Sequence, residues 1–309
     1  MNIQEDPLCL TVINEVLNRL QFLTYNNRMD ERHQLLWESG CIIRKYLYSF
    51  TLEGCPQGHL KNYINDAHAR FFRTFDIMPY IRDANVLEIG GNPYLFSILL
   101  RKFYGYEHVI TNFFSGNIYE DSLSYGKQII KSNDFGEEYC FHYTHLNIEL
   151  SKYPWPKNYF DMVVFTEVLE HLIVNPEQVF YNLFEILKQG GRLIVSTPNA
   201  VRLINCAAML CGKNIFDRYH TQNGVYGRHN REFTREEVNK FLLQAGFEID
   251  YSETMDRYNY DCVDMYTDSY ERSEKLPWKG SELHDLLSTI GAETVDRGDN
   301  IYCVGIKPK

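Results

Sequence analysis

The feature that most constrains the fold is a regular alternation of short apolar strands and amphipathic helices, which begins near residue 84. Strands are expected at residues 85–89, 108–111, 160–165, 192–197, 247–249 and 301–306, and helices at residues 93–104 and 176–189. Alternating strands and helices build a parallel sheet, because each helix returns the chain to the edge from which it left. The pattern therefore predicts an α/β fold with a doubly wound, mostly parallel sheet covered by helices on both faces.

The region before residue 80 has a different character, because its apolar residues recur at helical spacing. Residues 1–80 are predicted to be an N-terminal helical region, and residues 81–309 to be the main domain. Two polar, tyrosine-rich insertions, at about 201–232 and 251–299, are expected to interrupt that domain. Long insertions near strand ends often carry function.

Composition and charge exclude several classes of protein. The 309 residues are 44% hydrophobic, which is enough for a sizeable core, and the formal net charge of -10 argues against a broad nucleic-acid or anionic-membrane surface. The eight cysteines form no Cys-x-x-Cys pair, so neither a structural zinc site nor a disulfide framework is indicated. Without a signal peptide pattern or an apolar run of membrane-spanning length, the chain is expected in the cytoplasm, with no membrane partner.

The first chemical motif follows the strand at 85–89. That strand carries Glu88, and Gly90, Gly91, Asn92 and Pro93 come directly after it. Asn92 is expected to cap the next helix, and the glycines let a ligand approach the backbone closely. A dinucleotide-binding turn would have a third glycine, and a carboxylate would repel its pyrophosphate. The turn suits a ligand with an ammonium and hydroxyls but no phosphate, such as S-adenosylmethionine, with an ordinary strand–turn–helix as the alternative.

Three segments in order carry a family resemblance. Residues 87–93, 160–172 and 187–199 resemble motifs of the class I S-adenosylmethionine-dependent methyltransferases, and the similarity covers about residues 70–250. The resemblance implies an enzyme with a Rossmann-like, seven-stranded sheet. It also implies three sets of cofactor contacts. The methionine and ribose end of the cofactor would contact Glu88, Gly90, Gly91 and Asn92. Its adenine would contact Asn147 and Ile148, and its methionine moiety would be covered by Thr166 and Glu167.

The strand at 108–111 departs from the family pattern. The family usually has an acidic residue there that grips both ribose hydroxyls, whereas this chain has Asn112. An amide can accept and donate hydrogen bonds, but a charged acceptor binds roughly twice as strongly. Either Asn112 binds the ribose hydroxyls, or another residue such as Glu120 binds them, or the ribose is bound more weakly than in the family.

A carboxylate–histidine cluster is the candidate catalytic site. Glu167, Glu170 and His171 stand at i, i+3 and i+4, so they would share one face of a helix, and His229 would join them from the later insertion. The cluster is similar to that of the small-RNA 2′-O-methyltransferases, where such residues hold a divalent metal, and this donor set suits Mg²⁺ or Mn²⁺. Two alternatives stay open. His171 or His229 could act without metal as a base or acceptor ligand beside Glu170, or the cluster could be structural.

A well-defined helix start follows His229. Thr234 and Glu237 form the pattern of a capping box, and Phe233 and Val238 occupy the positions of a hydrophobic staple. This rigid start could aim His229 at the mouth of the sheet.

The acceptor is the least constrained part of the prediction. Residues 227–234, after Thr-Pro-Asn at 197–199, resemble enzymes that methylate sugars, polysaccharides or natural products. The expected activity is therefore O-methylation of a sugar, a glycan or a related small molecule. One alternative is the 3′-terminal ribose of an RNA, which the acidic charge disfavours; another is a cofactor-binding module without catalysis. The N-terminal helices could cover the acceptor pocket or form a homodimer contact.

Overall fold

The computed structural model describes residues 7–107, 109–114, 123–216, 225–256 and 280–309. The chain forms two compact units. The first comprises residues 1–114, 121–147 and 159–164, and the second comprises residues 115–120, 148–158 and 165–309.

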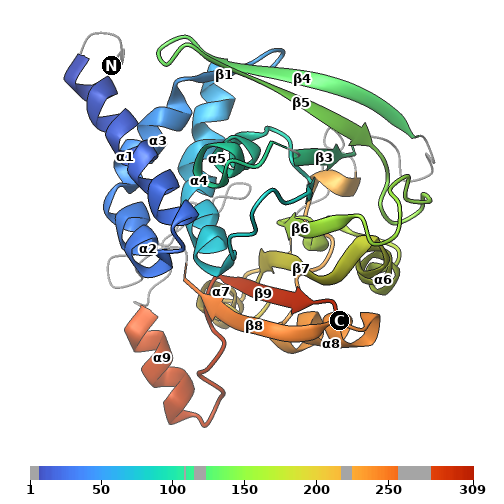
Figure 1. Cartoon of the computed structure of the whole chain (residues 1–309). Helices are drawn as coiled ribbons and strands as arrows, with labels where there is room; N and C mark the ends of the chain where they lie inside the picture. The colour runs from blue at the N-terminus through green and yellow to red at the C-terminus, as the bar shows by residue number, and fades with distance from the viewer. Residues whose placement is uncertain (1–6, 108, 115–122, 217–224, 257–279) are drawn as a thin grey trace. The chain divides into compact units, whose positions relative to one another are not determined.

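The described residues of the first unit form five helices. They are α1 (Pro7–Tyr25), α2 (Met29–Glu38), α3 (Gly40–Tyr48), α4 (Gln57–Ile77) and α5 (Leu95–Tyr104). Helix α1 packs on α5, α2 and α3, and apolar side chains such as Leu17, Leu20 and Ile43 are fully buried between them (Figure 1). The helical spacing in the first 80 residues is therefore used for packing.

The strands of the first unit follow the order β1-β4-β5-β3-β2-β6. Strands β2 and β3 are parallel, as are β3 and β5, whereas β4 pairs antiparallel with both β5 and β1. Their bounds are β1 (Phe50–Leu52), β2 (Val86–Ile89), β3 (Val109–Phe113), β4 (Ser124–Ser132), β5 (Glu137–His145) and β6 (Phe160–Thr166). Only residues 160–164 of β6 belong to the first unit.

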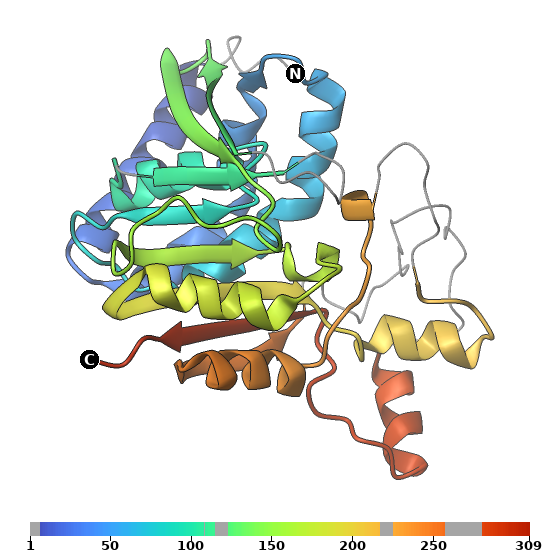
Figure 2. The ribbon, with the colours of Figure 1, turned by 90° about the vertical axis from the view of Figure 1, so that its right-hand side faces the viewer.

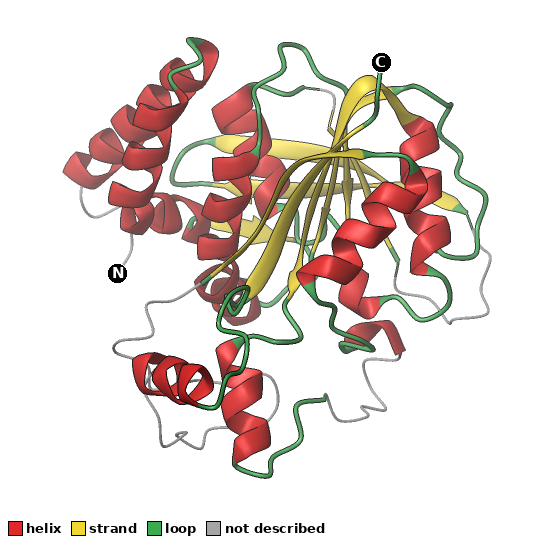
Figure 3. Cartoon of the chain, turned by 90° about the horizontal axis from the view of Figure 1, so that it is seen from below, coloured by secondary structure: helices red, strands yellow, loops and turns green. Residues whose placement is uncertain are grey.

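The described residues of the second unit include the end of β6 and the strands β7-β9-β8, in that order, with β9 antiparallel to both neighbours. Helices α6 and α8 pack on each other and lie along these strands, while α7 and α9 form a separate small core of their own (Figures 2 and 3). The elements are β7 (Leu187–Pro198), β8 (Glu248–Met255), β9 (Asn300–Ile306), α6 (Pro176–Ile186), α7 (Leu203–Leu210), α8 (Arg235–Ala245), α9 (Gly280–Thr289) and the 3₁₀ turns η2 (Leu169–His171) and η3 (Val225–Gly227).

The predicted α/β class with a mostly parallel central sheet is confirmed, but the strand count is not. The described residues form nine strands rather than seven. The order places β1 and β4 outside β5, where a hairpin doubles the chain back. That hairpin turns through Asn133–Gly136, and Gly136 adopts a left-handed φ of 62°, which glycine takes without strain.

Two predicted helix boundaries are wrong. Asn92 is not a helix cap, because the chain makes one more turn, in which the Tyr94 N–H donates to the Gly91 carbonyl, and α5 begins only at Leu95. The helix predicted to run to residue 189 ends at Ile186, and the two glycines at 190 and 191 lie inside β7. A distant lysine satisfies the carbonyls at that helix end: Lys307 Nζ donates to the Phe184 and Leu187 carbonyls at 2.8 and 2.9 Å.

The N-terminal helical region is not continuous between residues 29 and 48. It divides at Ser39, which follows the last residue of α2 and precedes the first residue of α3.

Among the described residues, no helix combines the length and the apolar character that crossing a membrane requires.

Candidate active site

The glycine turn after β2 belongs to the first unit. Gly90 has a φ of 77°, and the N–H groups of Gly90 and Gly91 both donate to the Asn112 carbonyl, at 2.8 and 3.0 Å. A Cβ on Gly91 would lie 3.0 Å from the Thr111 side chain and 3.4 Å from the Glu88 carboxyl. Both positions therefore favour glycine, Gly90 for its backbone angle and Gly91 for the tight space around a Cβ.

Glu88 lies directly behind this turn. Its carboxylate is buried and accepts a hydrogen bond from the Ser97 hydroxyl. Burial raises the pKa of Glu88 to about 8, and the Ser97 hydrogen bond offsets this shift only in part. A carboxylate in such surroundings gains strongly from a ligand that brings an ammonium or a hydroxyl.

Asn112 has a structural task that the sequence did not reveal. Its side-chain amide donates to the carbonyls of Thr144 and Leu146, at 3.0 and 3.2 Å, and so ties the end of β3 to the end of β5. Both donors of the amide are used in this way, and a ribose hydroxyl could be bound only by its side-chain oxygen. If Asn112 binds the ribose, its side-chain oxygen can therefore only accept a hydrogen bond from a ribose hydroxyl.

We expect Asn112→Ala to lower the free energy of unfolding by about 1–3 kcal/mol, because two buried carbonyls would lose their donors. Equilibrium unfolding in urea measures this loss. Thr51→Ala serves as a control, since its hydroxyl, on the edge strand β1, donates to one carbonyl only, that of Lys131. An unchanged midpoint in Asn112→Ala would show that the bridge between β3 and β5 contributes nothing.

The remaining predicted cofactor residues divide between the two units. Asn147, in the first unit, is buried, and Ile148, in the second, is buried and accepts a hydrogen bond from Tyr153 at its carbonyl. Thr166 ends β6, and Glu167 follows with a left-handed φ of 54°. Such a conformation is uncommon outside glycine and often occurs at functional sites.

The Glu167 carboxylate is directed at β7 and β9 of its own unit. It accepts from the Ser196 hydroxyl and from the Asn300 amide, both at 2.8 Å. Glu167 is therefore not among the three side chains whose ligand atoms the structure brings together, Glu170, His171 and His229, although its charge still acts on Glu170.

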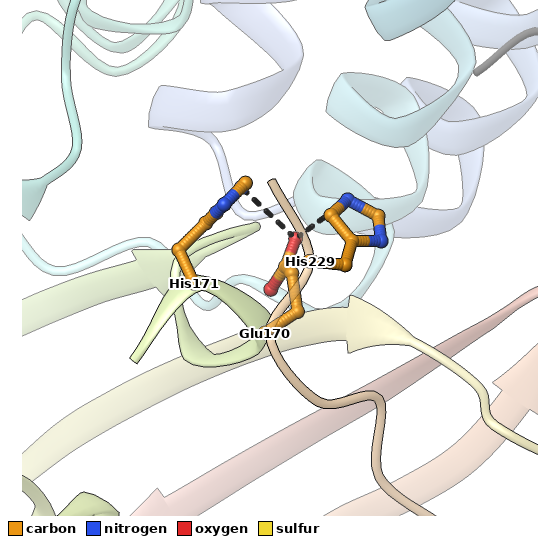
Figure 4. Close-up of side chains that lie close together, drawn as sticks. All are labelled: Glu170, His171 and His229. Atoms are coloured by element: carbon orange, nitrogen blue, oxygen red, sulfur yellow. Dashed lines mark ion pairs between the residues drawn. The ribbon is translucent and has the colours of Figure 1, made fainter. Parts of the chain in front are cut away.

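Glu170, His171 and His229 form a compact cluster within the second unit (Figure 4). The imidazole Nε2 atoms of His171 and His229 lie 3.8 and 4.0 Å from the same oxygen, Glu170 Oε1. Glu170 is almost fully buried, and its other oxygen accepts from the Thr197 hydroxyl at 3.0 Å. Burial and the nearby Glu167 carboxylate raise the pKa of Glu170, while the two histidines act in the opposite direction.

The far side of each imidazole is anchored. His171 Nδ1 lies 2.8 Å from the Arg228 carbonyl, and His229 Nδ1 lies 3.0 Å from the Glu232 carboxylate. Because a carbonyl and a carboxylate can only accept, each Nδ1 carries the proton and each Nε2 of the neutral ring carries a lone pair. Burial acts against ionisation of Glu232, but the hydrogen bond from His229 and the Arg202 guanidinium lower its pKa to about 2.

The loop that carries His229 is fixed to η2 by its main chain. The Asn230 N–H donates to the Glu170 carbonyl at 2.7 Å, and the Asn230 side chain donates to the His171 carbonyl at 2.8 Å. Helix α8 then begins with the predicted capping box of Thr234 and Glu237. The helix start expected from the sequence is therefore present.

Glu149 holds two segments that flank the cluster residues in sequence, and no spacing pattern predicts this role. Its carboxylate accepts the N–H groups of residues 173–175 at 2.6–3.0 Å, and the Tyr226 hydroxyl lies at 3.3 Å. These contacts fix the chain after η2 and the 3₁₀ turn η3. Of the tyrosines in the insertions, Tyr226 and Tyr251 have hydrogen-bond partners here, and Tyr219, Tyr258, Tyr260, Tyr266 and Tyr270 lie outside the described residues.

A known family accounts for most of this chain. Residues 57–252, more than half of the sequence, match the model of a methyltransferase domain. The chain belongs to this methyltransferase family. It is a class I enzyme that uses S-adenosylmethionine, as the three sequence motifs predict.

Solved structures are similar to this methyltransferase at low sequence identity. A chain in the complex of the Haloferax volcanii Trm112 methyltransferase activator with a methyltransferase is 12% identical, with a TM-score of 0.52 over 82% of this chain and 95% of that one. A methyltransferase from Thermotoga maritima is 16% identical, with a TM-score of 0.44 over 91% and 98%. No curated protein matches the sequence.

The glycine turn of the methyltransferase fits its cofactor. S-adenosylmethionine carries an ammonium and ribose hydroxyls, and the buried Glu88 carboxylate is an acceptor for such donors. Neither Gly90 nor Gly91 carries a side chain that would keep a ligand away from the backbone beside that carboxylate. Glu88, Gly90 and Gly91 are thus the residues of the first unit that we expect to hold the cofactor.

Proposed function

We propose that this methyltransferase transfers a methyl group to a hydroxyl of a sugar, a glycan or a related small molecule, at the cluster of Glu170, His171 and His229. The observation that carries the proposal is the convergence of two imidazole Nε2 atoms on one buried carboxylate oxygen. The sugar or glycan class is supported by the resemblance of residues 227–234 to enzymes with such acceptors.

The electrostatics of the cluster favour a bound cation. Three lone-pair atoms lie within 4.8 Å of one another, and both Nδ1 protons point away from them. Such an arrangement is repulsive unless a positive charge lies among the three atoms. Oxygen and imidazole donors suit Mg²⁺ or Mn²⁺, so we assign Glu170, His171 and His229 as the residues that would hold one of them.

The chemistry divides between the cofactor and the chain. When bound, S-adenosylmethionine supplies an electrophilic methyl group, and a divalent cation at the cluster would lower the pKa of an acceptor hydroxyl. The chain contributes orientation: buried Glu170 and the two anchored imidazoles keep three lone pairs directed at one point. In the metal-free alternative, Nε2 of His171 or His229 would accept the hydroxyl proton, which typically accelerates such a step by about 10²–10⁴-fold.

A chelator distinguishes these two mechanisms. We expect EDTA to reduce turnover at least about tenfold, because the cluster would lose the charge that lowers the hydroxyl pKa. Added Mg²⁺ or Mn²⁺ should restore the rate, and EDTA presaturated with Mg²⁺ is the control. Full activity in EDTA would reject the metal and leave the histidine base as the mechanism.

An acceptor screen with radiolabelled S-adenosylmethionine tests the substrate class. Label transfer to free sugars, nucleotide sugars or oligosaccharides supports the proposal. Transfer to the 3′ end of an RNA, with binding that weakens steeply as salt rises, would replace it with the RNA alternative. Cofactor binding without transfer to any acceptor class would favour the non-catalytic module.

A further inference from the structure

A second carboxylate, Glu232, lies behind His229 on the side away from Glu170. Its Oε1 atom is 3.0 Å from His229 Nδ1, and its side chain is 14% exposed. Glu232 follows His229 by three residues and immediately precedes the staple residue Phe233, so its backbone position is set by the start of α8.

Glu232 is surrounded by hydrogen-bond donors. Arg202, at the start of α7, donates from both terminal nitrogens of its guanidinium, at 2.8 and 2.9 Å, and the Asn205 amide donates at 3.0 Å. The Arg202 pair is bidentate, the strongest geometry for a guanidinium and a carboxylate. With the His229 ring added, four N–H groups point at two oxygens, and only an ionised carboxylate can accept all of them.

We propose that Glu232 is a positioning residue that holds His229 in the tautomer with its proton on Nδ1, so that the Nε2 lone pair faces Glu170. Arg202 and Asn205 extend this control to α7, within the insertion at 201–232. Histidines that ligate metals, or that act as bases, depend on such a partner for ring orientation and basicity. The inference rests on the proposed function only where it concerns catalysis, because the tautomer itself is independent of any reaction.

His171 provides an internal control. Its Nδ1 is held at 2.8 Å by the main-chain carbonyl of Arg228, which no side-chain substitution at position 232 removes. Both histidines present Nε2 to the same Glu170 oxygen, so a change confined to the His229 ring identifies Glu232 as its cause.

The informative substitution is Glu232→Gln. A glutamine has one oxygen, which we expect to stay with Asn205 and one Arg202 nitrogen, so its amide nitrogen would face His229. That nitrogen can only donate, and His229 Nδ1 would become the acceptor. The ring proton would then move to Nε2, directly between His229 and Glu170.

Long-range ¹H–¹⁵N NMR of histidine-labelled full-length protein reads the tautomer directly, with the His229 signal assigned by comparison with His229→Gln. We expect an Nδ1–H ring at His229 in the wild type, an Nε2–H ring in Glu232→Gln, and an unchanged His171 ring in both. An Nε2–H ring at His229 in the wild type would overturn the inference, whether or not the variant folds.

Kinetics separate positioning from structural support. We expect Glu232→Gln to lower kcat about 10–100-fold with little change in KM for S-adenosylmethionine, and Glu232→Asp to recover part of that loss. Glu236→Gln, at an exposed carboxylate in the first turn of α8, should match the wild type. A shifted tautomer with full kcat would reject the proposed function and leave the control of the ring intact. An unshifted tautomer in Glu232→Gln would reject this inference alone.

Discussion

Glu170→Gln is expected to lower kcat by about 10²–10⁴-fold while the protein becomes no less stable. The substitution removes the negative charge on which two imidazole Nε2 atoms converge, so the cluster loses its anionic ligand for a cation and, without metal, the charge that stabilises a protonated imidazole. Stability should hold or rise, because burial already disfavours the charged carboxylate and raises the pKa of Glu170. The glutamine oxygen can keep the hydrogen bond from Thr197, and its amide can donate toward the two lone pairs.

Steady-state kinetics and thermal unfolding of the same preparation test both halves of this expectation. Glu177→Gln, a carboxylate in the first turn of α6 that lies outside the cluster, is the control. A fall in kcat accompanied by an equal loss of folded protein would indicate a structural role for Glu170. Wild-type kcat in Glu170→Gln would remove the cluster from the mechanism.

Local features of the fold could be predicted because neighbouring residues determine them. The capping box of Thr234 and Glu237 is confirmed, and both staple residues, Phe233 and Val238, are buried as expected. The same holds for the buried strand β2 and the glycine turn that follows it. In each case the favoured backbone conformation is encoded within about five residues.

Features that depend on distant partners could not be predicted in this way. A helix was expected to carry Glu167 together with Glu170, but the 3₁₀ turn begins only at Leu169 and Glu167 adopts a left-handed φ. Its carboxylate is instead drawn to Ser196 and Asn300, whose contributions no spacing rule reveals. The end of α6 was misplaced for the same reason, since its carbonyls are satisfied from the far end of the sequence.

The cluster of Glu170, His171 and His229 could be predicted only in part. Glu170 and His171 are adjacent in sequence, and family resemblance suggested that His229 would join them, but spacing alone could not bring that loop to η2. Main-chain hydrogen bonds from Asn230 do so in the structure. The contact between Glu232 and His229 Nδ1 depends on the folded conformation of the loop. The only sequence signal for it is the position of this carboxylate, three residues after the candidate histidine.

Gly90→Val is expected to abolish measurable binding of S-adenosylhomocysteine, the demethylated product, and to lower the free energy of unfolding by about 1–2 kcal/mol. The two losses have different origins. The unfolding term comes from the left-handed φ of 77°, which a branched side chain adopts only with strain. The binding term comes from a branched side chain on the turn that directly follows the buried Glu88, where the cofactor is expected to approach the backbone.

Gly136→Val isolates the first of these terms. Gly136 has a similar left-handed φ of 62°, and a Cβ there would meet no other atom within 4 Å, so valine adds strain without filling a site. Calorimetry with S-adenosylhomocysteine and urea unfolding of both variants complete the comparison. Similar losses of unfolding free energy with binding lost only in Gly90→Val would place the cofactor at this turn, because strain alone would have affected both variants alike. Equal affinity in the two variants would mean that the cofactor binds elsewhere, and that the turn after β2 needs its glycine for the backbone alone.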